Sequence, residues 1–299
     1  FLDNIIKRHP DMNAFENMPV RIPKTVVLCT DIFDEFMETH DLYAIALSDL
    51  PDEEILHHFL KAHLPQRLAD DCRVMMNVVS GPLAIRSSSL LEDSHYQPFA
   101  GIYSTYMIPP LENQDARLEL LGDAIKAVYA SVYYKDSKAY MTATSNVIDQ
   151  EKMAVIIQEV IGQTHETRFY PHISGVARSI NYYPVDDQKA EDGIVNLALG
   201  LGKYIVDGGQ NLRVDPYQPQ RIMQLSEMEI ALRETQTRFL ALDLSQTELN
   251  FKTDDGFNLL NLSVRQADKD GALRWISSTY DAYDQIIRDG YYEGPSRKI

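Results

Sequence analysis

The chain has 299 residues, a net formal charge of −16 at pH 7 and two cysteines, Cys29 and Cys72. A chain of this length can bury an ample core, as one large domain or two modest ones, without disulfide or metal staples. The negative charge argues against nucleic acid as a partner, because such binding needs clustered Lys and Arg; no apolar run is long enough for a membrane span, and the low cysteine content fits a reducing, cytoplasmic setting.

The first residues predict a short opening helix. Leu2, Ile5 and Ile6 recur at the spacing of one helical face. The chain starts with Phe1 rather than Met, and this residue lies directly in the helical pattern. We therefore expect the sequence to be a piece of a longer protein.

A strand and a long helical stretch follow the opening helix. The β-branched residues at 25–28 predict a strand that leads into a helix, and the expected cap of this helix is Thr30 or Asp31. Residues 51–77 are expected to be helical, since Pro51 and the acidic residues directly after it are typical of a helix N-terminus.

The next segment contains the parts of a phosphate site. Residues 84–106 read AIRSSSLLEDSHYQPFAGIYSTY. The Arg86 guanidinium presents a planar fork of donors that matches phosphate oxygens, and a turn at Gly101 lets backbone N–H groups approach an anion closely. The alternative is a strand that ends in a Ser-rich loop, with Arg86 paired to Glu92 or Asp93. Composition by itself favours this second interpretation.

The order and spacing of these residues closely resemble the nucleotide-binding segment of the phosphoenolpyruvate synthase and pyruvate phosphate dikinase family. The family pattern is V-R-S-S-x-x-x-E-D, followed by F-A-G and a nearby Thr. The resemblance implies an α+β fold of the ATP-grasp type, with two α+β lobes around a nucleotide cleft, incomplete in this chain. It assigns contact with the ATP phosphates, and a catalytic role, to Arg86, and it implies that Gly101 and Thr105 help to hold the phosphates.

A long amphipathic helix is predicted at 115–141, and an apolar run at 153–162 is typical of a buried strand. One interpretation of this run is a core strand that simply extends into solvent. In an ATP-grasp fold, the segment after such a strand is the hinge that meets the adenine. The resemblance therefore places Gln158, Glu159 and Val160 on the adenine and ribose side.

Residues 169–184, FYPHISGVARSINYYP, resemble the family's G-V-x-x-S/T-x-N-P strand. Gly175 would allow a close approach of the backbone. On this strand Arg178, Ser179 and Asn181 could face the cleft in alternation, and the resemblance makes Arg178 a nucleotide-binding candidate.

A glycine-containing loop comes next, with Gly200 and Gly202 as binding candidates. Its glycine spacing does not fit a dinucleotide fingerprint, but it resembles the family's G-L-G-x-x-V-x-G loop. A variable position of that loop is often Glu, whereas this chain has Lys203 there. Lys203 could contact phosphate or pair with Asp207, and Arg213 is ambiguous in the same way.

The last part of the chain resembles the family less. It predicts an amphipathic helix, short strands with an Asp-Asp-Gly turn at 254–256, and a terminal helix near 281–288. We therefore divide the chain into an N-terminal lobe at 1–110, a second lobe at 111–219 and a connecting subdomain at 220–299.

The cofactors that the resemblance implies are ATP and Mg²⁺. The family's acidic metal-binding strand and its Q-x-R-P segment do not occur in this sequence, so we expect the metal ligands to lie outside the chain. Glu92 and Asp93 are a less favoured choice for the metal pair. His57, His58 and His63 lack an acidic or cysteine partner at ligand spacing, and we expect no metal site there.

The resemblance implies that the chain is the ATP-binding part of a phosphoenolpyruvate synthase-like phosphotransferase. ATP would phosphorylate a histidine on a separate domain, and the phosphoryl group would then pass to pyruvate. The implied partners are the phosphohistidine domain and the pyruvate/phosphoenolpyruvate-binding domain of the intact protein. The chain by itself is expected to be inactive and to bind nucleotide weakly. The alternatives are a non-catalytic nucleotide-binding or interaction module, and a related dikinase with another acceptor.

Overall fold

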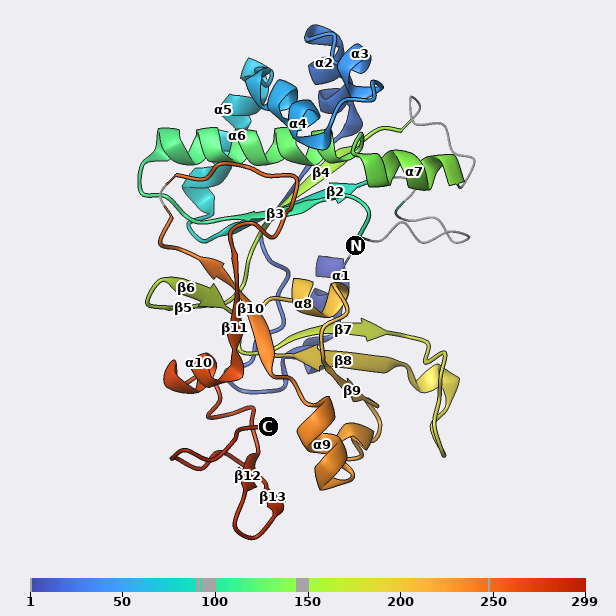
Figure 1. Ribbon diagram of the computed structural model, residues 1–299, viewed down its shortest axis with the longest axis vertical. Helices are drawn as coiled ribbons and strands as arrows, with labels where there is room; N and C mark the ends of the chain where they lie inside the picture. The colour runs from blue at the N-terminus through green and yellow to red at the C-terminus, as the bar shows by residue number, and fades with distance from the viewer. Residues whose placement is uncertain (1, 90–91, 93–100, 144–150, 247) are drawn as a thin grey trace. The chain divides into compact units, whose positions relative to one another are not determined.

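The computed structural model describes residues 2–89, 92, 101–143, 151–246 and 248–299 (Figure 1). These form two compact units, unit 1 with Phe1–Ile161 and Leu249–Phe257, and unit 2 with Gly162–Glu248 and Asn258–Ile299. The unit boundaries do not follow the division at 110 and 219, because β4 (Ala154–Glu159) pairs with strands from the start of the chain. The expected α+β class is confirmed.

Unit 1 contains an antiparallel four-stranded sheet in the order β1-β4-β2-β3. Its other strands are β1 (Thr25–Leu28), β2 (Leu83–Ser88) and β3 (Thr105–Ile108). The predicted strand at 25–28 is confirmed with the same bounds. The apolar run at 153–162 is β4, but only Val155 and Ile157 are buried in it, since one face of this strand lies outside the core.

Helix α6 lies across one face of this sheet, and α2, α4 and α5 lie on the same side (Figure 1). The helices of unit 1 are α1 (Leu2–Arg8), the 3₁₀ helix η1 (Pro10–Asn13), α2 (Thr30–Thr39), α3 (Tyr43–Ala46), α4 (Asp52–Lys61), α5 (Gln66–Val78), α6 (Gln114–Ser131) and α7 (Lys135–Ala143). The long helix predicted at 115–141 is divided into α6 and α7. Helix α6 begins where the Asn113 side chain accepts hydrogen bonds from the amides of Asp115 and Ala116.

Two other helix boundaries differ from the prediction. The N-cap of α2 is Cys29, with no side-chain hydrogen bond, rather than Thr30 or Asp31. The helical stretch at 51–77 is divided into α4 and α5, because Pro65 restricts the residue before it and begins the second helix.

A segment from far along the chain completes the core of unit 1. We call Leu249–Phe257 the strap. Its Phe251 and Phe257 rings contact the Tyr106 ring of β3, with centroids 5.4 and 6.3 Å away. The predicted turn at 254–256 lies in the strap, where Asp254 Oδ1 accepts a hydrogen bond from the Gly256 amide at 2.9 Å.

Unit 2 contains a four-stranded sheet in the order β11-β10-β6-β5, a three-stranded sheet β7-β8-β9 and the hairpin β12-β13. The strands are β5 (Gln163–His165), β6 (Arg168–Tyr170), β7 (Ser174–Arg178), β8 (Ile194–Ala198), β9 (Leu212–Val214), β10 (Arg238–Asp243), β11 (Leu259–Ser263), β12 (Thr279–Asp281) and β13 (Ile286–Arg288). The helices are η3 (Ala190–Asp192), α8 (Lys203–Val206), η4 (Met223–Leu225), α9 (Met228–Glu234) and α10 (Val264–Lys269). None of the helices in the described residues is long and apolar enough to cross a membrane.

The helix predicted near 281–288 is wrong, because this segment is the β12-β13 hairpin. The Asp281 carboxylate accepts hydrogen bonds from the amides of Tyr283 and Asp284. Gln285 then takes the left-handed conformation, with φ +54°. This side-chain turn competes with a helix and reverses the chain.

Candidate functional site

The sheet of unit 1 has one face packed against the helices and a second face that carries predicted phosphate residues. Directly paired residues of neighbouring strands share a face, and successive residues alternate between faces. Ile85, Tyr106 and Ile157 form one row, and their side chains are buried. Arg86 and Thr105 form the next row, so they lie side by side on the opposite face, which we call the Arg86 face.

The Arg86 guanidinium is exposed, and it has no hydrogen bond or ion pair with the residues that the structure describes. The alternative prediction of a salt bridge to Glu92 is wrong. The Glu92 carboxylate accepts hydrogen bonds from the Ser87 hydroxyl at 2.8 Å and the Ser89 amide at 3.0 Å instead. Asp93, the other predicted partner, lies outside the described residues. The guanidinium can therefore bind an external anion.

The turn before β3 contains a glycine with positive φ. The first amide of β3 is engaged in a hydrogen bond within the protein. Gly101 has φ +83°, which favours glycine, and no described atom lies within 4 Å of the position of a Cβ. The Thr105 amide donates a hydrogen bond to Asp255 Oδ2 at 2.7 Å. This amide is not free for phosphate, whereas the Thr105 side chain remains on the Arg86 face.

Two carboxylates near these strands are absent from the sequence-based site. Glu151 is 8 % exposed; burial raises the pKa of its carboxyl, and the negative charge of Glu92 adds to this rise. The second is Asp255, which bonds Thr105 from 150 residues away. No local sequence signal marks either residue, because only the fold brings them to these strands.

The predicted adenine hinge consists of the last two residues of β4 and Val160. The Gln158 side chain donates a hydrogen bond to Thr25 Oγ1 at 3.0 Å. The Glu159 amide donates to the Lys24 carbonyl at 3.0 Å, and the Val160 amide to the Pro82 carbonyl at 2.9 Å. These amides cannot also bind a base.

The residue after the predicted hinge residues, Ile161, has a backbone amide that is not engaged by a described acceptor. The amide of Ile161 has no acceptor among the described residues, and the Ile161 side chain is 59 % exposed. The backbone amide without an acceptor at the end of this strand is therefore one residue beyond the predicted set.

On β7 the predicted residues have different environments. Arg178 and Ser179 are exposed, and the Arg178 side chain has no hydrogen bond or ion pair within the described ranges. Asn181 is 1 % exposed, and its carboxamide oxygen accepts a hydrogen bond from Arg213. Arg213 is thereby a structural residue of unit 2. Gly175 is explained by packing, since a Cβ there would lie 2.8 Å from a Leu197 methyl group.

The residues of the glycine loop contact other residues of unit 2. Gly200 has φ +87°, and a Cβ would lie 2.7 Å from the Leu240 carbonyl oxygen of β10. At Gly202 a Cβ would make only ordinary contact. The Lys203 ammonium lies 3.3 Å from Asp207 Oδ1, so the structure contains the ion pair that was one of the two predicted roles of this lysine.

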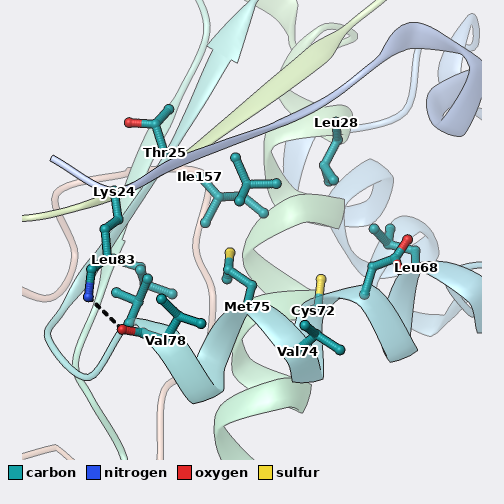
Figure 2. Close-up of a pocket in the computed structure, with 13 residues that line it drawn as sticks. Lys24, Thr25, Leu28, Leu68, Cys72, Val74, Met75, Val78, Leu83 and Ile157 are labelled. Carbon is teal, nitrogen blue, oxygen red and sulfur yellow. Dashed lines mark hydrogen bonds between the residues drawn. The ribbon is translucent and has the colours of Figure 1, made fainter. Parts of the chain in front are cut away.

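A half-open, largely apolar cavity of about 450 Å³ lies in unit 1 between β1 and α5 (Figure 2). At one end the Lys24 ammonium donates a hydrogen bond to the Val78 carbonyl at 2.6 Å. Burial raises the pKa of the Cys72 thiol in its wall to about 11, so this thiol is protonated at neutral pH. None of the predicted site residues lines this cavity.

The described residues do not fit a metal site. No group of three or more His, Cys, Asp or Glu side chains in this part of the chain could hold a metal ion. Glu92 is bound by serine donors, as described above. Mg²⁺ therefore stays a prediction from the resemblance.

Comparison with known proteins identifies the family of the chain. A family model described as pyruvate phosphate dikinase, AMP/ATP-binding domain, matches residues 9–263, a range that includes every predicted site residue. The uncharacterized phosphotransferase YvkC of Bacillus subtilis (strain 168) is 26% identical over 166 residues. This alignment covers 56% of the chain and 18% of that relative, so the chain spans a small part of the relative's length.

Proposed function

Because the chain belongs to the family of pyruvate phosphate dikinase AMP/ATP-binding domains, we propose that it binds ATP as the nucleotide-binding part of a phosphotransferase. The full reaction that we propose is transfer of a phosphoryl group from ATP to a histidine on a separate domain, and from there to pyruvate. The chemistry of the acceptor comes from the family resemblance and not from any residue described above.

The observation that carries the proposal is the state of Arg86. This guanidinium is exposed at the end of β2, beside Thr105, and the nearest acidic residue in sequence is bonded to serines. A charged fork of donors with a neighbouring hydroxyl forms strong, charge-assisted hydrogen bonds with phosphate oxygens. We assign Arg86 to the phosphates and the Thr105 hydroxyl to their support.

The hinge supports the base-binding part of the proposal. A backbone N–H without an acceptor, as at Ile161 among the described residues, can recognise the edge of a base independently of side-chain identity. Gln158 lies on the Arg86 face of the same sheet, since it is paired with Ala84 of β2. We assign no step to Mg²⁺, because the described residues hold no metal group.

A second candidate is a nucleotide-binding module that does not transfer phosphate. The observation that favours it is Lys203, which replaces the Glu that is common at this position in the family and is paired with Asp207. The two candidates share ATP binding. Only the first predicts that the intact protein consumes ATP in a pyruvate-dependent way.

The proposal is tested by calorimetric titration of the chain with ATP. We expect weak binding, and we expect Arg86→Ala to weaken it by about tenfold or more, the size of a lost hydrogen bond to a charged group. The matched control is Arg73→Ala, an exposed arginine of the same unit that pairs with Asp70. Equal affinity for ATP in the Arg86→Ala variant and the unchanged chain would remove Arg86 from the site.

A further inference from the structure

The strap is contributed by the connection between β10 and β11, yet it packs in unit 1. Phe251 is buried there with 9% exposure, and its ring lies 5.5 Å from the ring of Phe257. Both rings contact Tyr106. The strap is thus fastened to β3 by an aromatic cluster of its own.

Two hydrogen bonds join the strap to consecutive residues of β3. The Tyr106 hydroxyl donates to the Lys252 carbonyl at 2.8 Å, and the Thr105 amide donates to Asp255 Oδ2 at 2.7 Å. Burial raises the pKa of Tyr106 to about 12, so its phenol keeps the proton that it donates. The strap therefore holds β3 from the core side and from its outer edge.

The outer edge of β3 depends on this contact. β3 is the last strand of its sheet and pairs only with β2 among the described strands. The residue before Thr105 is held by α6, since the Ser104 amide donates to Ser131 Oγ at 3.2 Å. The Thr105 amide donates to the carboxylate of Asp255. A hydrogen bond from an amide to a carboxylate is about twice as strong as one to a neutral acceptor.

We propose that Asp255 is a positioning residue of the nucleotide site. By holding the Thr105 amide it fixes the end of β3, and with it the Thr105 side chain beside Arg86, where the phosphates bind. This inference rests on the function proposed above. It assigns no contact between Asp255 and the nucleotide.

If Asp255 acted through its charge instead, its substitution would change the ATP affinity in the opposite direction. If the Asp255 carboxylate lay close to the phosphates, its charge would repel them, and removing the charge would strengthen ATP binding. A positioning role depends on the acceptor and not on the charge. Asp255→Asn keeps a carbonyl acceptor without the charge, whereas Asp255→Ala removes both.

The experiment measures the dissociation constants of ATP and adenosine for the unchanged chain and three variants. We expect Asp255→Ala to weaken ATP binding by about three- to tenfold while adenosine binding changes little, since only the phosphate side is displaced. Asp255→Asn is expected to recover most of the ATP affinity. The control is Asp254→Ala, which removes a neighbouring carboxylate that bonds within the strap.

Thermal melting of each variant identifies any that do not fold. If Asp255→Ala is unfolded, the comparison of Asp255→Asn with the unchanged chain still decides between the roles. Tighter ATP binding in Asp255→Asn overturns the proposal, as does equal loss of ATP and adenosine binding in Asp255→Ala. A chain that binds neither ATP nor adenosine overturns the proposed function itself, whereas ATP binding that Asp255→Ala leaves unchanged overturns the role of Asp255 alone.

Discussion

The serine run at the end of β2 determines where the local negative charge lies. Ser87 and Ser89 bind the Glu92 carboxylate through a hydroxyl and an amide, which leaves Arg86 without that partner. Glu151 lies near Glu92 in a buried position. The end of β2 therefore combines an accessible cation with a buried carboxyl whose pKa is raised.

We predict that Glu151→Gln stabilises the protein near neutral pH. A carboxyl whose pKa is higher in the folded than in the unfolded state contributes stability while it is protonated, and loses that contribution as the pH rises through its folded value. The thermal midpoint of the variant should exceed that of the unchanged chain near pH 7, and the difference should vanish near pH 4. Glu112→Gln, at an exposed position, is the control. A lower midpoint for Glu151→Gln near pH 7 would contradict this account.

Among the elements, β6 and α10 are joined by a buried polar network. Asp270 directly follows the C-terminus of α10, and its carboxylate accepts hydrogen bonds from Arg168 at 2.9 Å, Tyr170 at 2.7 Å and Gln266 at 3.0 Å. Burial by itself would raise the pKa of Asp270, but these hydrogen bonds outweigh it and lower the pKa. The network stabilises unit 2 above the ordinary pKa of an aspartate, and that stability is lost as the pH falls through the lowered value.

We predict that Asp270→Asn lowers the free energy of unfolding by about 2–4 kcal/mol, because it removes the buried carboxylate from the mostly buried Arg168 guanidinium and leaves it only the exposed carboxylate of Glu166. Urea denaturation near neutral pH measures this change. The control is Asp284→Asn, which removes a partner of Arg288 at a more exposed pair and should change the stability much less. An equal decrease in the free energy of unfolding for the two variants would show that the buried network contributes no more than an exposed ion pair.

At the scale of the molecule, neither compact unit is one continuous stretch of chain. The chain passes between them at residues 161–162, 248–249 and 257–258. The core of unit 1 therefore depends on residues that follow most of unit 2 in sequence. Phe251 is the clearest case, since it packs on Tyr106 of β3.

We predict that Phe251→Ala weakens unit 1 although residue 251 is flanked in sequence by strands of unit 2. Truncation of a buried Phe costs about 3–5 kcal/mol. Hydrogen exchange followed by mass spectrometry should find faster exchange in peptides that contain β2 and β3. Phe15→Ala, at a site that is 69% exposed, should leave these peptides unchanged. Faster exchange only in peptides of β10 and β11 would contradict the assignment of the strap to unit 1.

Predictions that depend on interactions between residues close in sequence agree with the structure more often than those that depend on tertiary contacts or on side-chain hydrogen bonds to the backbone. The strand at 25–28 and the long helix α6 were predictable, since β-branched content and helical periodicity act over a few residues. The segment 281–288 was not, because the Asp281 side chain bonds the backbone of its own turn. Glu159 and Val160 were placed on the adenine and ribose side, but the amides of these two residues bond the Lys24 and Pro82 carbonyls.

The sequence by itself determined the α+β class, the family and the presence of Arg86 before a serine run, because these depend on residues that are neighbours in the chain. The tertiary structure alone decided that Arg86 stands beside Thr105, that serines engage Glu92, and that Asp255 holds the Thr105 amide. The last contact joins residues 150 positions apart. No local pattern encodes such a contact, since it exists only when the whole chain has packed.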